Sequence, residues 1–406
     1  MAVRKYIGTR TQKMFRTIAL HIKRGRELWL SLSFGYVDLI SGAISALVLL
    51  FVIRDVPWIL SILPVLLSVR GATNGVFSGV LSTSLHIGTI EPRFRSNTEH
   101  YYSLIAAVFT MPMLNALISM LILGIFFIDP IKMILSFFVL LLASSIAVVF
   151  SIIMTSFIGF MAFRKGFNPD DVVYPIMSTV NDVFASLFLV AAVLIIRPWD
   201  TSYAFFTGFF VFIILAGCVI YAYKKNKESE TYKTTLREAY GGIIYSIFFS
   251  SLAGIILTRL YDYFVEDYLF LIILPFVMTI LGDVSSVLVS RLTTALSLGE
   301  IEYRSIDNIF AFMAESLVDI SAPLLFSLTI ATFLVSILVN AFSKVLMFML
   351  VVYLVSVFVL ITEIPIIAGI SVSTFKRGLN PDNFSIPIVT STADFLTVLA
   401  FFVVVS

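Results

Sequence analysis

Long apolar runs recur along almost the whole chain and leave little room for any fold other than a bundle of membrane-spanning helices. A helix needs roughly 20 apolar residues to cross the hydrocarbon core of a bilayer. The 406 residues are 59% hydrophobic and only 13% charged, whereas soluble domains carry about 25% charged residues. Such a chain must cover much of its surface with lipid.

Eleven candidate spans follow from these runs, so the sequence predicts an all-α, polytopic membrane protein. The spans lie near residues 28–53, 58–85, 102–128, 133–162, 172–196, 200–223, 239–260, 268–296, 310–340, 345–372 and 383–405.

Basic residues are distributed unequally between the two sides of the predicted bundle. If the N-terminus is cytoplasmic, the cytoplasmic segments hold twenty Lys and Arg residues and the opposite loops hold five. Because basic loops favour the cytoplasmic side, we expect a protein of the cell (plasma) membrane with its N-terminus inside and its C-terminus outside. Residues 1–26 form a basic cytoplasmic segment, either on the membrane surface or disordered.

Several function classes find no support in the sequence. One cysteine excludes an internal disulfide and a cysteine-rich metal site. The three histidines are far apart and have no zinc-site spacing. No nucleotide loop, serine triad or nucleic-acid face is present. We therefore expect neither an enzyme nor a nucleic-acid partner.

The chain contains an internal repeat. Residues 163–182 (FRKGFNPDDVVYPIMSTVND) and 375–394 (FKRGLNPDNFSIPIVTSTAD) are identical at eight of twenty positions, at an offset of 212. Residues 64–91 align with 275–302 at an offset of 211. The matching residues include Pro, Gly, Asn and Asp, so a shared apolar composition does not explain the match. The sequence predicts two copies of one five-helix unit.

The repeat sets the expected organisation. A first five-helix repeat covers 27–197, a linker helix with a polar cytoplasmic linker (224–237) covers 198–237, and a second repeat covers 238–406. A repeat of five spans ends on the opposite side of the membrane from where it began. The extra span 200–223 carries the chain back to the first side, so both repeats have the same orientation. They are then related by a pseudo-two-fold axis along the membrane normal, and a pathway is expected between them.

Each repeat carries an aspartate in its last helix, Asp182 and Asp394. Each follows a proline (Pro175, Pro387) by seven residues and lies near mid-membrane. Charged groups at that depth are costly and usually functional. Two facing carboxylates with room for water suit Mg²⁺, which keeps most of its hydration shell. The alternative is a protonated or hydrogen-bonded aspartate that serves helix packing.

The Asn-Pro-Asp motifs before these helices have two interpretations. Asn168 with Asp170, and Asn380 with Asp382, match the residue types that cap a helix N-terminus. A role at a cytoplasmic gate is the alternative.

Glycines in the second helix of each repeat also have two interpretations. The prolines at 64 and 275 precede Gly71 and Gly282, and a broken helix there would expose backbone carbonyls to an ion. Close helix packing at the glycines explains the same residues.

The second repeat is the more acidic one. Asp283, Glu315, Asp319 and Glu363 align with Ala72, Leu104, Val108 and Ser151. A second cation or proton site in this repeat would use them. Alternatively, Glu315 and Asp319, which share one helix face, lie at the membrane interface.

The motifs resemble a known family. The NPDNxxxPIxxSxxD pattern and the preceding Pro…Gly-Asp…SRLTTALSLG stretch look like the membrane domains of MgtE-type magnesium transporters, and are closer still to solute carrier family 41. The resemblance implies a five-helix domain paired with a second copy, and divalent-cation transport past the aspartates that match Asp182 and Asp394. It also implies a large cytosolic sensor, for which residues 1–26 are too short.

These observations lead to one expected function and two alternatives. The first is transport of divalent cations, chiefly Mg²⁺, as substrate and with no cofactor; the partners are the ion and the lipid bilayer. A single chain is compatible with a monomeric pseudo-dimer. The alternative is a Na⁺- or H⁺-coupled exchanger that uses the extra acids. An intramembrane enzyme acting on lipid-linked phosphates would need a dense cluster of acids and basic residues, and the scattered acids do not supply one.

Overall fold

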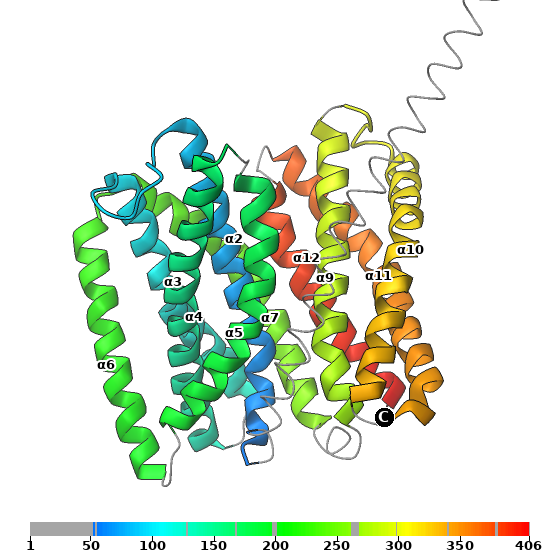
Figure 1. The fold of residues 1–406 in the computed structure, drawn as a ribbon, viewed down its shortest axis with the longest axis horizontal. Coiled ribbons are helices and arrows are strands. Elements are labelled where there is room, and N and C mark those ends of the chain that lie inside the picture. The colour runs from blue at the N-terminus through cyan, green and yellow to red at the C-terminus, as the bar shows by residue number, and fades with distance from the viewer. Residues whose placement is uncertain are drawn as a thin grey trace, which may run out of the picture.

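A computed structural model of the chain shows a bundle of long helices (Figure 1). It describes residues 52, 55–126, 129–166, 169–196, 201–260, 268–297, 299–338, 341–377 and 381–405. Within these ranges there are ten α-helices, two short 3-10 helices and no strand. The elements are η1 (Pro57–Ser61), α2 (Leu63–Ile87), α3 (Glu99–Phe126), α4 (Pro130–Arg164), α5 (Pro169–Ile196), α6 (Thr201–Asn226), α7 (Glu230–Arg259), α9 (Tyr268–Ser297), α10 (Ile306–Leu338), η2 (Phe342–Lys344), α11 (Val345–Lys376) and α12 (Pro381–Val405).

The predicted fold class is confirmed. The ten helices coincide with ten of the eleven predicted spans, and the remaining span, 28–53, lies almost wholly outside the described residues. Nine of the described helices are long and apolar enough to cross a membrane, and α5 contributes a shorter apolar stretch, Phe184–Ile196. The loops 88–98 and 299–305 lie at one end of the bundle, called the basic end below, and the C-terminus lies at the opposite end (Figure 1).

The linker between the repeats is more helical than predicted. The polar segment 224–237 was expected to be a linker, but α6 continues to Asn226 and α7 begins at Glu230. The side chain of Ser229 accepts a hydrogen bond from the backbone N–H of Tyr232, and Glu230 lies in the first turn. A serine N-cap and an acidic first turn stabilise a helix start, which explains why polar residues here are helical.

The expected break in the second helix of each repeat is wrong. Helices α2 and α9 continue through Gly71 and Gly282 without interruption. Pro64 lies in the first turn of α2, where a missing N–H costs nothing, and Pro275 is accommodated inside α9. No backbone carbonyls are therefore released by a broken helix at these glycines.

The first described helix of the second repeat, α7, joins the two halves of the bundle. It packs on α12 of its own repeat and on α2 and α3 of the first repeat. Near the basic end, His100 of α3 hydrogen-bonds through Nδ1 to the Thr231 hydroxyl of α7 (2.8 Å) and through Nε2 to the Ser84 hydroxyl of α2 (3.1 Å). Both repeats therefore form one packed body.

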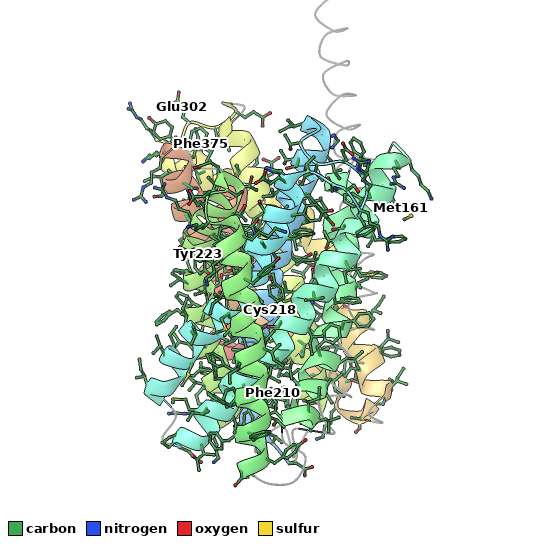
Figure 2. The ribbon with its side chains drawn as sticks, turned by 90° about the vertical axis from the view of Figure 1, so that its left-hand side faces the viewer. Met161, Phe210, Cys218, Tyr223, Glu302 and Phe375 are labelled. Carbon is green, nitrogen blue, oxygen red and sulfur yellow. The ribbon has the colours of Figure 1, made fainter. Side chains whose placement is uncertain are left out.

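Helix α6 lies at the edge of the bundle and presents an apolar surface. Phe206, Phe209, Phe210 and Ile213 are each more than half exposed, and Figure 2 shows α6 with Phe210 and Cys218 along its outward face. Only 11% of its most apolar stretch is buried within the protein. An exposed apolar face of this length is what a lipid-facing span requires.

We predict that Gly254→Ala destabilises the bundle. A Cβ atom at Gly254 of α7 would lie 1.9 Å from the backbone oxygen of Ser61, so α7 or η1 would have to shift. Overpacking of this kind costs about 1–3 kcal/mol, and the melting temperature of the detergent-purified protein should fall. Gly217→Ala in α6 is the control, because nothing lies within 4 Å of its Cβ position. Equal melting temperatures for wild type and Gly254→Ala would contradict the close approach.

Candidate functional site

Helix α12 meets helices of both repeats near Asp394. The Ser391 hydroxyl lies 3.1 Å from the hydroxyl of Ser68 on α2, in the first repeat. One residue earlier, Thr390 contacts Gly282 of α9, in the second repeat, where a Cβ atom would lie 3.9 Å from the threonine. Asp394 follows Ser391 by about one helical turn and is half-buried. Asp394 is thus close to the junction of the two repeats.

The equivalent part of the first repeat is described less fully. Asp182 lies within α5, at the position that matches Asp394, and its side chain is outside the described part of the molecule. The same holds for the side chains of Asp170, Pro175 and Asp382, and for the whole of Asn168 and Asn380. Helices α5 and α12 begin at Pro169 and Pro381, in agreement with the helix-start interpretation of the Asn-Pro-Asp motifs.

The backbone carbonyl of Pro387 in α12 accepts a hydrogen bond from a neighbouring helix as well as from its own. Its carbonyl accepts hydrogen bonds from Ser391 (2.7 Å) and Thr390 (3.2 Å) of the same helix, and from Ser246 of α7 (2.8 Å). This cross-link holds α12 against α7, one to two turns before Asp394.

A buried polar network in the first repeat was not predicted. Asn74 Oδ1 of α2 accepts hydrogen bonds from Ser151 Oγ (2.9 Å) and Thr155 Oγ1 (3.0 Å) of α4, and Asn181 Nδ2 of α5 donates to Ser151 Oγ (3.4 Å). All four side chains are at most 5% exposed. Asn181 directly precedes Asp182, so the network surrounds the backbone that carries that aspartate.

The second repeat makes the same contact with different chemistry. Ser285 of α9 is the equivalent of Asn74, and Glu363 of α11 is the equivalent of Ser151. The Ser285 hydroxyl donates to Glu363 Oε2, and Glu363 is 0% exposed. Equivalent residues therefore meet in both repeats, with a carboxyl group in one and a hydroxyl in the other. Alignment of the repeats identified Glu363 as an acid without an acidic equivalent. The role of Asn74 is visible only from its hydrogen bonds in the structure.

Of the remaining acids of the second repeat, one forms an ion pair and two are exposed. Arg291 Nη1 of α9 lies 3.4 Å from Asp319 Oδ2 of α10, so Asp319 already has a cationic partner. Glu315 and Asp283 are exposed. Among the described residues, no three His, Cys, Asp or Glu side chains come together to hold a metal ion.

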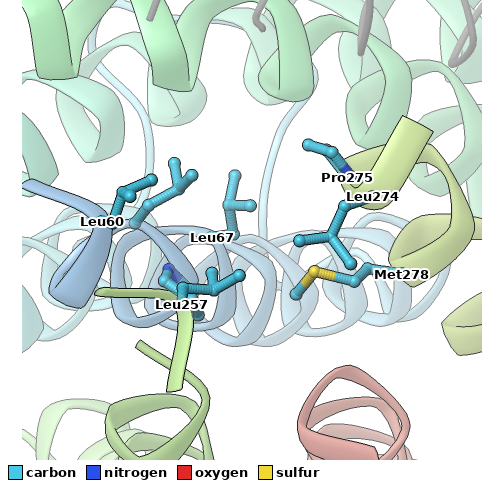
Figure 3. Close-up of a pocket in the computed structure, with 8 residues that line it drawn as sticks. Leu60, Leu67, Leu257, Leu274, Pro275 and Met278 are labelled. Carbon is cyan, nitrogen blue, oxygen red and sulfur yellow. The ribbon is translucent and has the colours of Figure 1, made fainter. Parts of the chain in front are cut away.

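A small apolar cavity lies between the repeats (Figure 3). Its wall includes three pairs of equivalent residues at the offset of 211, namely Leu63 with Leu274, Pro64 with Pro275, and Leu67 with Met278. Leu60 and Leu257 complete it. Because equivalent residues face the same cavity, the pseudo-two-fold axis passes through it, in the half of α2 and α9 away from the basic end.

Comparison with known families agrees with this duplicated architecture. The MgtE family, described as divalent cation transporter, matches residues 63–192 and again 274–404, together well over half of the chain. The chain belongs to the MgtE family. The two MgtE segments start 211 residues apart and end 212 residues apart, which are the offsets of the internal repeat.

The MgtE match accounts for the architecture at the level of the family. It identifies a multi-pass membrane protein of a divalent cation transporter family, with the membrane domain present twice. Each matched segment begins in or at the second helix of a repeat and ends in the last helix, α5 or α12. No curated protein and no solved structure matches the chain.

We predict that Asn74→Val destabilises the first repeat. The change removes the acceptor shared by Ser151 and Thr155, and a buried hydroxyl without its partner costs about 1–3 kcal/mol. The melting temperature in detergent should fall. Thr73→Val is the control, because the buried Thr73 hydroxyl bonds only to carbonyls of its own helix. A melting temperature for Asn74→Val that equals that of Thr73→Val would show that the network contributes nothing.

Proposed function

We propose that this MgtE-family chain transports divalent cations, chiefly Mg²⁺, along a pathway between its two repeats, where Asp182 and Asp394 bind a hydrated ion. The observation that carries the proposal is the position of Asp394, about one turn from the point where α12 meets α2 of the other repeat. The internal repeat gives Asp182 the equivalent position in α5.

The chemistry of the pair favours an ion that keeps its water. Mg²⁺ is bound through one or two carboxylates and retains several water molecules. Among the described residues no dense ligand cluster is available to replace that water. Two carboxylates on opposite repeats therefore match Mg²⁺ better than an ion that demands six or more protein oxygens.

The proposed orientation places the basic end in the cytoplasm. The basic end carries Arg93, Arg164, Lys224, Arg304 and Lys376, among other cations, and basic loops favour the cytoplasmic side. This puts the C-terminus outside the cell membrane, as expected from the sequence, and turns the apolar cavity toward the exterior.

The apolar cavity is proposed to close the pathway in this conformation. Its wall consists of Leu, Pro and Met side chains from both repeats. A constriction lined by such residues excludes water and therefore an ion that travels with its hydration shell. Opening would separate α2 from α9 at this level.

Coupled exchange with Na⁺ or H⁺ is the second candidate. The observation that favours it is Glu363, a buried acid with no equivalent acid in the first repeat. Measuring Mg²⁺ flux into proteoliposomes, with and without imposed Na⁺ and proton gradients, distinguishes uncoupled transport from coupled exchange. A flux that neither gradient changes excludes coupling.

We predict that Asp182→Asn and Asp394→Asn each reduce Mg²⁺ uptake into proteoliposomes by roughly tenfold or more, the loss of about 1.4 kcal/mol of ion binding. Asp307→Asn is the control, because Asp307 is exposed in the first turn of α10 and loses the same charge. Full uptake by either variant, at normal yield and melting temperature, would refute the shared site.

We predict that Met278→Ser raises resting Mg²⁺ uptake several-fold. The hydroxyl and the lost volume let water enter the cavity, which weakens an apolar closure. The matched control is Leu67→Met on the facing wall, which keeps the surface apolar. If Met278→Ser and Leu67→Met have the same resting uptake in proteoliposomes, the cavity is not the closure.

A further inference from the structure

Glu363 is a buried acid with only half of its hydrogen-bonding capacity in use. Ser285 donates to Oε2, whereas Oε1 has no hydrogen-bond partner among the protein atoms that the structure describes. No Lys or Arg in that part of the chain forms an ion pair with it. Polar atoms this deeply buried almost always have a partner, so Oε1 calls for one that the protein itself does not provide.

The register of two packed helices places Glu363 at the same depth as Asp394. Both acids are 13 residues from the ends of α11 and α12 that face the connecting hairpin, Lys376 and Pro381, which is about 20 Å along each helix. Helices α11 and α12 pack against each other. The first repeat shows the same register directly, since Asn181, next to Asp182, bonds to Ser151 at the position of Glu363.

The two repeats differ in charge and in hydrogen-bonding groups at this position. In the first repeat, Asn74, Ser151, Thr155 and Asn181 satisfy one another without a charge. In the second, Thr155 and Asn181 are replaced by Ile367 and Ala393, so no amide is available to Glu363. At this position the second repeat therefore has a carboxyl oxygen, Glu363 Oε1, without a hydrogen-bond partner among the described residues, whereas the equivalent side chains of the first repeat bond to one another.

Two carboxylates in one poorly hydrated place repel each other unless one of them is protonated or a cation lies between them. A transported cation bound at Asp394 would relieve this repulsion.

Resting on the proposed function, we propose that Glu363 is a second pathway carboxylate, which binds the transported divalent cation together with Asp394. The ion is then held unequally, nearer the second repeat. Because Glu363 is wholly buried, contact with Oε1 requires the ion to lose part of its hydration shell. Mg²⁺ dehydrates reluctantly, so Glu363 contributes more to the binding of Mn²⁺, which accepts the same oxygen ligands, and acts as a specificity-determining residue.

A double-mutant cycle tests this proposal, with Mn²⁺ binding to the detergent-purified chain followed by electron paramagnetic resonance. We expect Glu363→Gln to weaken Mn²⁺ binding by roughly tenfold, and the double variant with Asp394→Asn to bind no more weakly than Asp394→Asn alone, because both groups hold one ion. When Mg²⁺ competes with Mn²⁺ for the site, Glu363→Gln should lower the affinity for Mg²⁺ less than it lowers the affinity for Mn²⁺. Ser285→Ala removes the hydrogen bond to Glu363 but keeps the acid, so it controls for disturbed packing and should weaken Mn²⁺ binding less than Glu363→Gln does. Asp307→Asn controls for the loss of one negative charge.

The outcomes separate this inference from the proposed function. Wild-type Mn²⁺ affinity in Glu363→Gln, with a loss in Asp394→Asn, overturns the inference and leaves the Asp182–Asp394 site standing. Additive losses in the double variant place the two acids at independent sites and overturn it as well. Unchanged binding in Asp394→Asn refutes the proposed site itself.

Discussion

Lipid cannot hydrogen-bond, so each polar group within a spanning bundle must find its partner inside the protein. Much of the interior of this bundle follows that requirement. Many serine and threonine hydroxyls donate to a carbonyl about one turn earlier in their own helix, as Ser144 and Thr332 do. The hydroxyls and amides that bond between helices are fewer. Among others, they join α2 to α4, α2 to α12, α3 to α7 and α9 to α11, and these contacts hold the repeats in register.

Duplication supplies the same scaffold twice but does not keep the chemistry the same. The contact between the second and fourth helices of a repeat is amide to hydroxyl in one copy and hydroxyl to carboxyl in the other. A similar substitution occurs between the second and third helices, where the Arg291–Asp319 pair replaces Val80 and Val108. Both side chains of that pair are partly exposed, and exchange of such an ion pair for apolar residues costs little, so the pair is compatible with a structural role. The isolated acid Glu363 has no such explanation.

Periodicity and composition were sufficient to predict most of the fold. Apolar runs of about 20 residues located ten described helices, because hydrocarbon thickness sets their length. The errors occurred where polar residues or glycines were treated as breaks. Segment 224–237 is largely helical because Ser229 caps α7. Helices α2 and α9 continue through Gly71 and Gly282, because a single glycine inside a helix costs only about 1 kcal/mol. Local propensity is a weak guide when tertiary packing surrounds a helix.

The sequence by itself determined the all-helical spanning architecture, the duplication, and the two last-helix aspartates, because each leaves a mark on residue order: apolar length, a constant offset, and an acid in an apolar run. The tertiary structure alone decided which polar groups act together. It paired Asp319 with Arg291, left Glu315 and Asp283 exposed, and set Glu363 at the depth of Asp394 on neighbouring helices. Helices distant in sequence meet according to side-chain shape and hydrogen bonding, and a linear pattern of residues does not encode which faces will touch.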